Sequence, residues 1–210
     1  MFTEEILKYC AQHSTTSPLY LQDIERDTFL HHLHAHQIAG EYQGRLLSLL
    51  SKLKKPQRIL ELGTFTGYSA LCLAEGLSAE GLLITIEKNP ELETKILKNI
   101  QKSPFFKQIK VKIGEALNLI PQLQEVWDLV FIDADKTNYL NYYQLIFPFL
   151  APKALIIIDN VLWKGKVIEL KKDKKTESLQ QFNEFLRKDP RVEVMMLPIR
   201  DGLTVIQKKD

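Results

Sequence analysis

The chain has 210 residues, 45% of them hydrophobic, which is enough for one domain with a sizeable core. Its 28 basic and 26 acidic residues leave a net charge of +2, so nothing in the overall charge favours nucleic acid or a membrane surface as a partner. Because no basic-then-apolar leader opens the sequence and no apolar run reaches the ~18 residues of a membrane span, we expect a soluble, cytoplasmic protein.

Residues 1–56 are predicted to form a helical cap ahead of the main fold. Thr3 is a suitable N-cap for a first helix, which ends at the break between Ser14 and Pro18. Two more helices are predicted over 21–34 and 41–53, where leucines recur at helical spacing. These helices are expected to cover the sheet, to form a lid or to make a subunit contact.

From residue 57 to 210, apolar runs of strand length alternate with helical patterns, which is typical of a parallel sheet wrapped by helices on both faces. The last connection, 198–202, is too short for a crossover helix, so the last strand is predicted to be antiparallel. We therefore predict a single α/β domain over 1–210 with a Rossmann-like, seven-stranded, mostly parallel sheet. Strands are predicted at 58–62, 82–87, 108–113, 127–132, 154–158, 192–197 and 203–207, and helices at 68–77, 91–101, 115–122, 138–150 and 176–188.

The first of these strands leads into a glycine turn, in the stretch RILELGTFTGYSA that starts at Arg58. Gly63 would let the backbone approach a ligand closely, and the helix that follows offers free N–H groups. The spacing is G-x-x-x-G, not the G-x-G-x-x-G of dinucleotide sites, and Glu61 precedes the first glycine. A carboxylate is unfavourable beside a pyrophosphate but suits an ammonium or sulfonium group, which favours S-adenosylmethionine over NAD.

Four predicted strands end in a carboxylate: Glu61, Glu87, Asp133 and Asp159. In open parallel sheets, ligands bind outside the carboxyl ends of the strands, so we expect these side chains to share one site. Glu87 lies about 20 residues beyond the glycine turn, where an acidic residue usually binds the ribose hydroxyls. The small residues around Gly114 would let an adenine ring lie against the backbone, although an ordinary helix N-cap turn explains them equally well.

The segments FIDADK, from Phe131, and DNVLW, ending at Trp163, add a second feature to this edge. Asp133, Asp159 and Asn160 offer three hard oxygen ligands, which suit Mg²⁺ best, with Mn²⁺ or Ca²⁺ as alternatives. Zinc is disfavoured because no histidine or thiolate joins the set. Lys136 is unfavourable at a helix start, close to Asp133, and we predict that it acts as a general base.

Taken together, these motifs resemble the class I S-adenosylmethionine-dependent O-methyltransferases, in the cation-dependent caffeoyl-CoA and catechol O-methyltransferase family, and its bacterial members most of all. ELGTFTGYSA matches the methyl-donor motif, FIDADK the metal and base motif, DNVLW the second metal motif and RDGL the closing hairpin. The resemblance covers nearly the whole chain. It implies that the donor is bound by Ala39, Glu61, Gly63, Thr64, Phe65, Tyr68, Ser69, Glu87, Lys88, Gly114, Glu115, Ala116, Asp133 and Tyr142.

The resemblance also implies a reaction, methylation of one hydroxyl of a small catechol-like phenol, with S-adenosylhomocysteine as the second product and a homodimer as the assembly. A divalent cation would lower the pKa of the phenolic hydroxyls. Lys164 stands where plant members carry a substrate-contacting Asn, which disfavours a caffeoyl-CoA-type acceptor. The implied catalytic residues are Lys136 and Asp133, the metal ligands are Asp133, Asp159 and Asn160, and the substrate contacts are Lys136, Asn160, Trp163 and Lys164.

Several alternatives stay open. Methylation of nucleic-acid bases is disfavoured by the near-neutral charge and by the lack of an Asn/Asp-Pro-Pro-aromatic motif. An O-methyltransferase for a non-catechol acceptor and a non-catalytic, dimeric donor-binding protein are the other two, and the second would be expected to have lost donor or metal residues. Four histidines lie between His31 and His36; we interpret them as a solvated or lid segment, because no cysteine or carboxylate completes a ligand set nearby. The lysine run 171–175 is expected to be a solvated loop.

Overall fold

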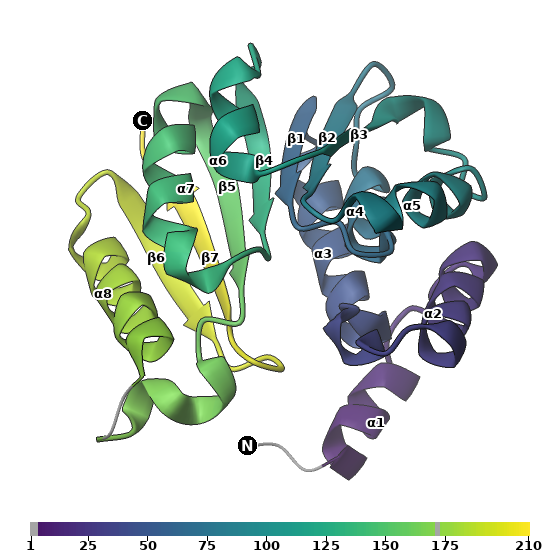
Figure 1. The fold of residues 1–210 in the computed structure, drawn as a ribbon, viewed down its shortest axis with the longest axis horizontal. Helices are drawn as coiled ribbons and strands as arrows, with labels where there is room; N and C mark the ends of the chain where they lie inside the picture. The colour runs from purple at the N-terminus through teal and green to yellow at the C-terminus, as the bar shows by residue number, and fades with distance from the viewer. Residues whose placement is uncertain (1–3, 171–172) are drawn as a thin grey trace.

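A seven-stranded sheet in the order β3-β2-β1-β4-β5-β7-β6 runs through the molecule (Figure 1). The computed structural model describes residues 4–170 and 173–210. Strands β1 to β5 pair in parallel, and β7 is antiparallel to both of its neighbours, as the sequence predicts. The strands are β1 (Arg58–Leu62), β2 (Leu82–Glu87), β3 (Ile109–Ile113), β4 (Trp127–Ile132), β5 (Leu150–Asp159), β6 (Val192–Leu197) and β7 (Leu203–Lys208).

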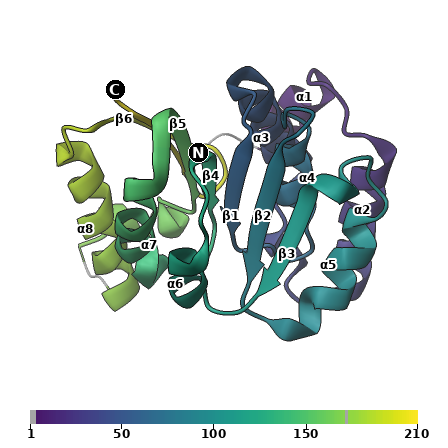
Figure 2. The same ribbon diagram turned by 90° about the horizontal axis from the view of Figure 1, so that it is seen from above.

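Helices cover both faces of the sheet (Figure 2). One core packs under α6, α7 and α8, and a second packs under α2 to α5. The helices are α1 (Glu4–Gln12), α2 (Leu19–His31), α3 (Gly40–Lys54), α4 (Tyr68–Ala74), α5 (Glu93–Ile100), α6 (Ala116–Leu119), α7 (Tyr139–Ile146) and α8 (Lys174–Lys188). Short 3₁₀ turns lie at η1 (Ala35–Gln37), η2 (Pro90–Leu92), η3 (Phe106–Gln108), η4 (Ile120–Gln122), η5 (Lys136–Asn138), η6 (Phe147–Phe149) and η7 (Trp163–Ile168). Within the described ranges, no helix is both long and apolar enough to cross a bilayer.

Some element boundaries differ from the predicted ones for local reasons. The second helix ends at His31 and not at residue 34, because His32 is extended, with φ −117° and ψ 127°. Strand β5 begins at Leu150, ahead of a register shift in its pairing with β4, and Lys153 lies in the left-handed region of the backbone. Of the predicted lysine-rich loop, the part from Lys174 belongs to α8, whose N-cap is Asp173. Thr3 and residues 171–172 lie outside the described residues, so the predicted N-cap at Thr3 stays a prediction.

Candidate functional site

Strand alternation places the strand-end carboxylates on one face of the sheet. Successive side chains of a strand point to opposite faces. In β1, Leu60 and Leu62 therefore enter the core under α6 to α8, whereas Ile59 enters the core under α2 to α5, and Glu61 shares the face of Ile59. The same rule puts Asp159 on the face of Ile157, which packs in that second core. The carboxylates thus face the N-terminal helices.

The glycine turn after β1 lines a pocket at this edge, and Gly63 explains why the turn is possible. Its φ is 93°, and the Cβ of any other residue there would stand 1.9 Å from the backbone oxygen of Asp133. The strand ends are therefore in close backbone contact, with the Gly63 N–H donating to the carbonyl of Ile86 over 2.9 Å. The residues that line the pocket are Gln37, Ile38, Ala39, Gly63, Thr64, Phe65, Thr66, Tyr68, Ser69, Phe131 and Asp133.

The pocket unites seven of the predicted donor-binding residues, drawn from three parts of the chain. They are Ala39 ahead of α3, the group Gly63, Thr64, Phe65, Tyr68 and Ser69 around the glycine turn, and Asp133 after β4. Sequence reasoning missed Gln37, Ile38, Thr66 and Phe131. The signal for Phe131 was present, since it is the last residue of β4 on the same face as Asp133; the segment 37–38 carries no such pattern.

Glu87 holds the glycine turn in place through its carboxylate. One oxygen accepts hydrogen bonds from the backbone N–H groups of Thr64, at 3.2 Å, and Phe65, at 2.9 Å, and the other accepts from the Asn89 N–H at 2.9 Å. The side chain sits at the end of β2 and is buried. Its predicted contact with a ribose stays a prediction, and the structure adds that the same carboxylate shapes the turn.

Glu61 is fully buried beneath that turn. Its Oε2 accepts a hydrogen bond from the Thr85 hydroxyl at 2.5 Å, and Thr85 is in turn 2.5 Å from the Thr64 hydroxyl. Its Oε1 is buried without a hydrogen-bond partner. Burial raises the pKa of the Glu61 carboxyl to about 8. Glu61 therefore lies behind the pocket-lining backbone, and direct contact with a donor stays a prediction.

The predicted adenine end lies on the other side of β1, where α6 and α7 meet. Ala116 begins α6 and is buried, and Tyr142 of α7 packs in the same core. Burial, and then the nearby charges of Asp135 and Glu115, raise the pKa of Tyr142 to about 12. Gly114 donates its N–H to the carbonyl of Glu87 over 2.8 Å, which joins this end to the ribose position. Lys88 is exposed.

Asp133 and Asp159 meet at the ends of the neighbouring strands β4 and β5. Asp133 Oδ1 accepts from the Lys136 ammonium at 2.8 Å. Asp159 is buried, and both of its carboxylate oxygens accept hydrogen bonds, Oδ1 from the Asn160 N–H at 2.7 Å and Oδ2 from Gln43 Nε2 at 2.6 Å. Burial, followed by the negative charge of Asp133, raises the pKa of the Asp159 carboxyl to about 6. The two carboxylates therefore repel each other.

This arrangement was tested for its fit to a divalent cation. Within the described residues no three His, Cys, Asp or Glu side chains come together as ligands, but the predicted set contains only two such residues and an amide. The Asn160 side-chain amide makes no hydrogen bond within residues 4–170 and 173–210. Two like charges and a free amide oxygen are what a hard cation would bridge. The residues therefore fit a cation of the Mg²⁺ type.

The loop after β5 has an unusual backbone at the predicted substrate residues. Asn160, Trp163 and Lys164 all have φ between 49° and 58°, a region that residues other than glycine rarely adopt. Trp163 buries its Nε1–H without a hydrogen-bond partner, and Lys164 is exposed. Strained residues of this kind cluster at binding sites, because the surrounding structure must hold them there. The predicted contacts of Trp163 and Lys164 with substrate stay predictions.

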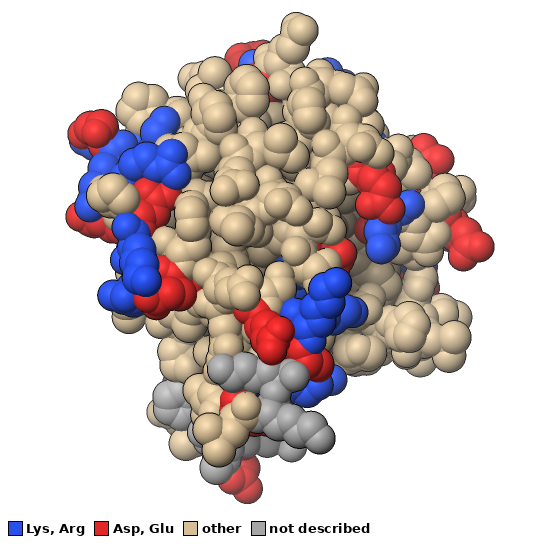
Figure 3. All heavy atoms as spheres, turned by 60° about the vertical axis from the view of Figure 1, so that its left-hand side comes forward, with Lys and Arg blue, Asp and Glu red and all other residues tan. Residues whose placement is uncertain are grey.

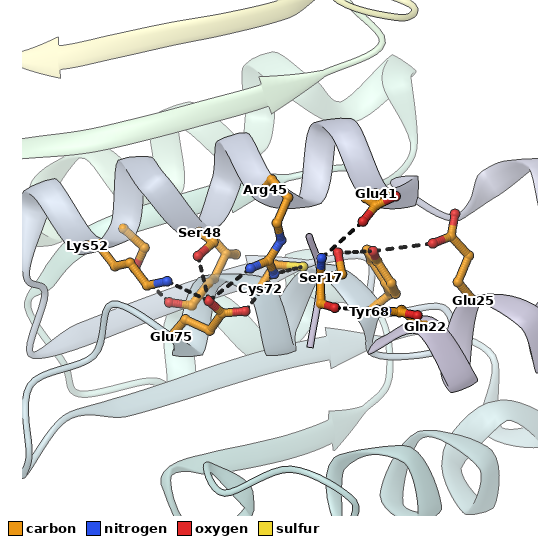
Figure 4. Close-up of polar contacts among 12 residues, drawn as sticks. Ser17, Gln22, Glu25, Glu41, Arg45, Ser48, Lys52, Tyr68, Cys72 and Glu75 are labelled. Atoms are coloured by element: carbon orange, nitrogen blue, oxygen red, sulfur yellow. Dashed lines mark hydrogen bonds and ion pairs between the residues drawn. The ribbon is translucent and has the colours of Figure 1, made fainter. Parts of the chain in front are cut away.

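The phenol of Tyr68 points away from the sheet edge. Its hydroxyl lies 3.5 Å from Ser17 and from Glu25, beneath the N-terminal helices (Figure 4). The Figure 4 view also shows the neighbouring pair between Arg45 and Glu75, which are buried and joined at 2.5 Å. The ring of Tyr68 thus anchors α3 and α4 to the loop before α2, while its first-turn backbone faces the pocket.

Arg200 and the histidine segment close the N-terminal side of the pocket. Arg200, in the hairpin between β6 and β7, donates to the carbonyls of Ile38 at 2.8 Å and His36 at 3.3 Å. The His32 ring meets the edge of Phe65, with ring centres 5.6 Å apart. His31 pairs with Asp27 of its own helix at 3.2 Å. The histidines therefore lie at the rim of the pocket, consistent with a lid segment.

Comparisons with known proteins agree with this geometry. The sequence model of the O-methyltransferase family matches residues 11–209. A catechol O-methyltransferase from Niastella koreensis is 36% identical over 74% of this chain and 72% of its own length, and caffeoyl-CoA O-methyltransferase 1 from Eucalyptus globulus is 35% identical over 79% and 72%. The S-adenosylhomocysteine-bound methyltransferase PaMTH1 from Podospora anserina superposes with a TM-score of 0.91 at 29% identity, over 100% of this chain and 98% of that one. The predicted resemblance is confirmed, and this chain belongs to the O-methyltransferase family.

Proposed function

We propose that this protein transfers a methyl group from S-adenosylmethionine to one hydroxyl of a small ortho-dihydroxy phenol, with the help of a divalent cation. The observation that carries the proposal is the double position of Asp133. It lines the pocket formed by the glycine turn, and it faces Asp159 at the end of the next strand. A donor site and a cation site that share one carboxylate would bring a methyl group and a cation-bound hydroxyl together.

Relatives and neighbours support the same assignment. PaMTH1 was solved with S-adenosylhomocysteine, the product that a methyl transfer leaves behind. Two of the curated relatives are named for catechol and for caffeoyl-CoA as acceptors. The buried Glu61 adds a negative charge behind the glycine turn, which favours a cationic donor.

The chemistry that we assign to this chain is limited to orientation and proton transfer. A bound divalent cation would supply positive charge that lowers the pKa of the acceptor hydroxyl. Lys136, whose ammonium is 2.8 Å from Asp133 Oδ1, would take the proton of that hydroxyl once its own proton has passed to solvent. The phenolic oxygen then forms a bond to the methyl carbon as the carbon–sulfur bond breaks, and S-adenosylhomocysteine leaves.

The test is methyl transfer from S-adenosylmethionine to caffeic acid, with Mg²⁺ and with EDTA. We expect turnover with Mg²⁺ that EDTA abolishes and that Asp159→Ala removes. Glu193→Ala, which changes an exposed carboxylate on β6, is the control and should leave turnover unchanged. Turnover that persists in EDTA would refute the cation, and a protein that fails to bind S-adenosylhomocysteine in a calorimeter would refute the donor.

We also propose that two copies associate. The edge strand β6 exposes 61% of Met195 and 38% of Val194, and an exposed apolar edge strand favours pairing with another chain. The N-terminal helices expose Tyr9 and Leu19 as well. The face drawn in Figure 3 carries basic and acidic side chains next to one another around uncharged areas, which suits a protein partner better than a nucleic acid. Light scattering would reveal a dimer, and a monomer at assay concentrations would contradict the proposal.

A further inference from the structure

A single side chain of the N-terminal helices contacts the Asp159 carboxylate. Gln43 lies in α3, is fully buried, and donates from Nε2 to Asp159 Oδ2 over 2.6 Å. The two residues are 116 positions apart in the chain. The hydrogen bond therefore joins the helices ahead of the sheet directly to the end of β5.

The other contacts of Asp159 come from its own side of the site. Its Oδ1 accepts from the Asn160 N–H at 2.7 Å, and its backbone carbonyl accepts from the Tyr139 hydroxyl at 2.9 Å. These two contacts fix the backbone and one oxygen but leave rotation of the carboxylate to be set by Oδ2. Gln43 supplies that last constraint.

The remaining polar atom of Gln43 is unusual. Its Oε1 is buried with no hydrogen-bond partner, although buried amide oxygens are normally paired. A glutamine whose only function was to fill space in the core would leave this acceptor unpaired with no gain, whereas leucine would fill the same space without it. The structure keeps the amide where its N–H can orient Asp159.

We propose that Gln43 is a positioning residue that presents the Asp159 carboxylate to the divalent cation, and so makes the cation affinity depend on the docking of α3. This inference rests on the proposed function, because it requires Asp159 to be a cation ligand. Partners that orient a ligand in this way typically change metal affinity by about 10-fold to 100-fold when they are removed.

The test compares two substitutions at Gln43 with a matched control on the same helix. Gln43→Met keeps the length of the side chain but removes the donor, and Gln43→Asn keeps the amide but is one methylene too short to reach Asp159. Ser51→Ala is the control, since Ser51 is equally buried in α3 and loses a 2.6 Å hydrogen bond to the Leu73 carbonyl, away from the site. For each protein, Mn²⁺ and S-adenosylhomocysteine are titrated separately by calorimetry, and the melting temperature is recorded.

We expect the Mn²⁺ Kd to rise by about 10-fold or more in both Gln43 variants, while the S-adenosylhomocysteine Kd stays within about twofold of the wild type. Ser51→Ala should lower the melting temperature without changing the Mn²⁺ Kd. An unchanged Mn²⁺ Kd in Gln43→Met would overturn the inference, and so would parallel losses of Mn²⁺ and S-adenosylhomocysteine affinity in all three variants. If the wild type binds S-adenosylhomocysteine but no Mn²⁺, the proposed cation site itself is wrong and the inference falls with it.

Discussion

Replacing Glu61 by glutamine should stabilise the ligand-free protein, and more so as the pH rises. Glu61 is fully buried, and burial raises its carboxyl pKa to about 8 from the 4.5 of an unperturbed group. A carboxyl with a raised folded-state pKa binds its proton more tightly in the folded than in the unfolded chain. Stability is therefore unaffected at pH values below both pKa values and falls as the pH rises between them.

The size of this effect follows from the two pKa values. Each pH unit between them lowers the free energy of unfolding by about 1.4 kcal/mol, until the carboxyl ionises in the folded protein as well. Between about pH 6 and about pH 8, the wild type should therefore lose about 2 kcal/mol that the Glu61→Gln variant retains. The unpartnered position at Oε1 imposes a penalty on the glutamine amide too, but that penalty is the same at both pH values.

The assay is urea unfolding of both proteins at the two pH values, without donor or metal. The quantity of interest is the difference in unfolding free energy between variant and wild type, and it should grow by about 2 kcal/mol from the lower to the higher pH. Glu193→Gln, at an exposed carboxylate, should show no such growth. A difference that is constant with pH would mean that Glu61 is ionised throughout this range, and the reasoning from burial would be refuted.

Three further predictions concern the backbone, the pocket rim and the surface. Gly63→Ala should lower the free energy of unfolding by more than about 3 kcal/mol and abolish S-adenosylhomocysteine binding, since its Cβ would overlap the Asp133 carbonyl; Gly165→Ala, with a similar φ and nothing within 4 Å, should cost only about 1 kcal/mol in urea unfolding. Arg200→Ala frees the carbonyls of Ile38 and His36, so the S-adenosylhomocysteine Kd should rise several-fold in calorimetry, and an unchanged Kd would show that the hairpin does not hold the rim. The hydrogen bond from Arg191 lowers the pKa of Asp189 to about 2, so Asp189→Asn should lose about 1–2 kcal/mol in urea unfolding at neutral pH, and that loss should vanish as the pH falls from about 4 toward 2; a loss that persists in acid would point to packing instead.

Much of the fold could be predicted because its determinants are local in the sequence. The apolar runs of β1, β4 and β5 are long enough to be buried on both faces, and the short final connection could only make an antiparallel pair. The end of α2 could not, because its apolar spacing continues past His31 and only the approach to Phe65 and the sheet turns the chain away.

The site was predicted as far as strand ends determine it. Glycines and carboxylates that follow a strand must meet at the sheet edge, so Gly63 and Asp133 could be placed together from sequence alone. Gln43 could not, since nothing within α3 says which strand end the helix faces. The depth of Glu61 was available in principle: it has the parity of Ile59 along β1, which places it inside and not at the rim.

The residues around the entrance come from three loops that the sheet does not constrain. The rim segment before α3, the strained turn after β5 and the hairpin of Arg200 are separate in sequence but adjacent in space. Substitutions in these loops can reshape the space for an acceptor while the Gly63 turn and the two aspartates stay intact. A transplant of all three loops from one relative into another would thus be a direct way to exchange acceptor preference, and a transplant of only one would break contacts such as that of Arg200 with residue 38.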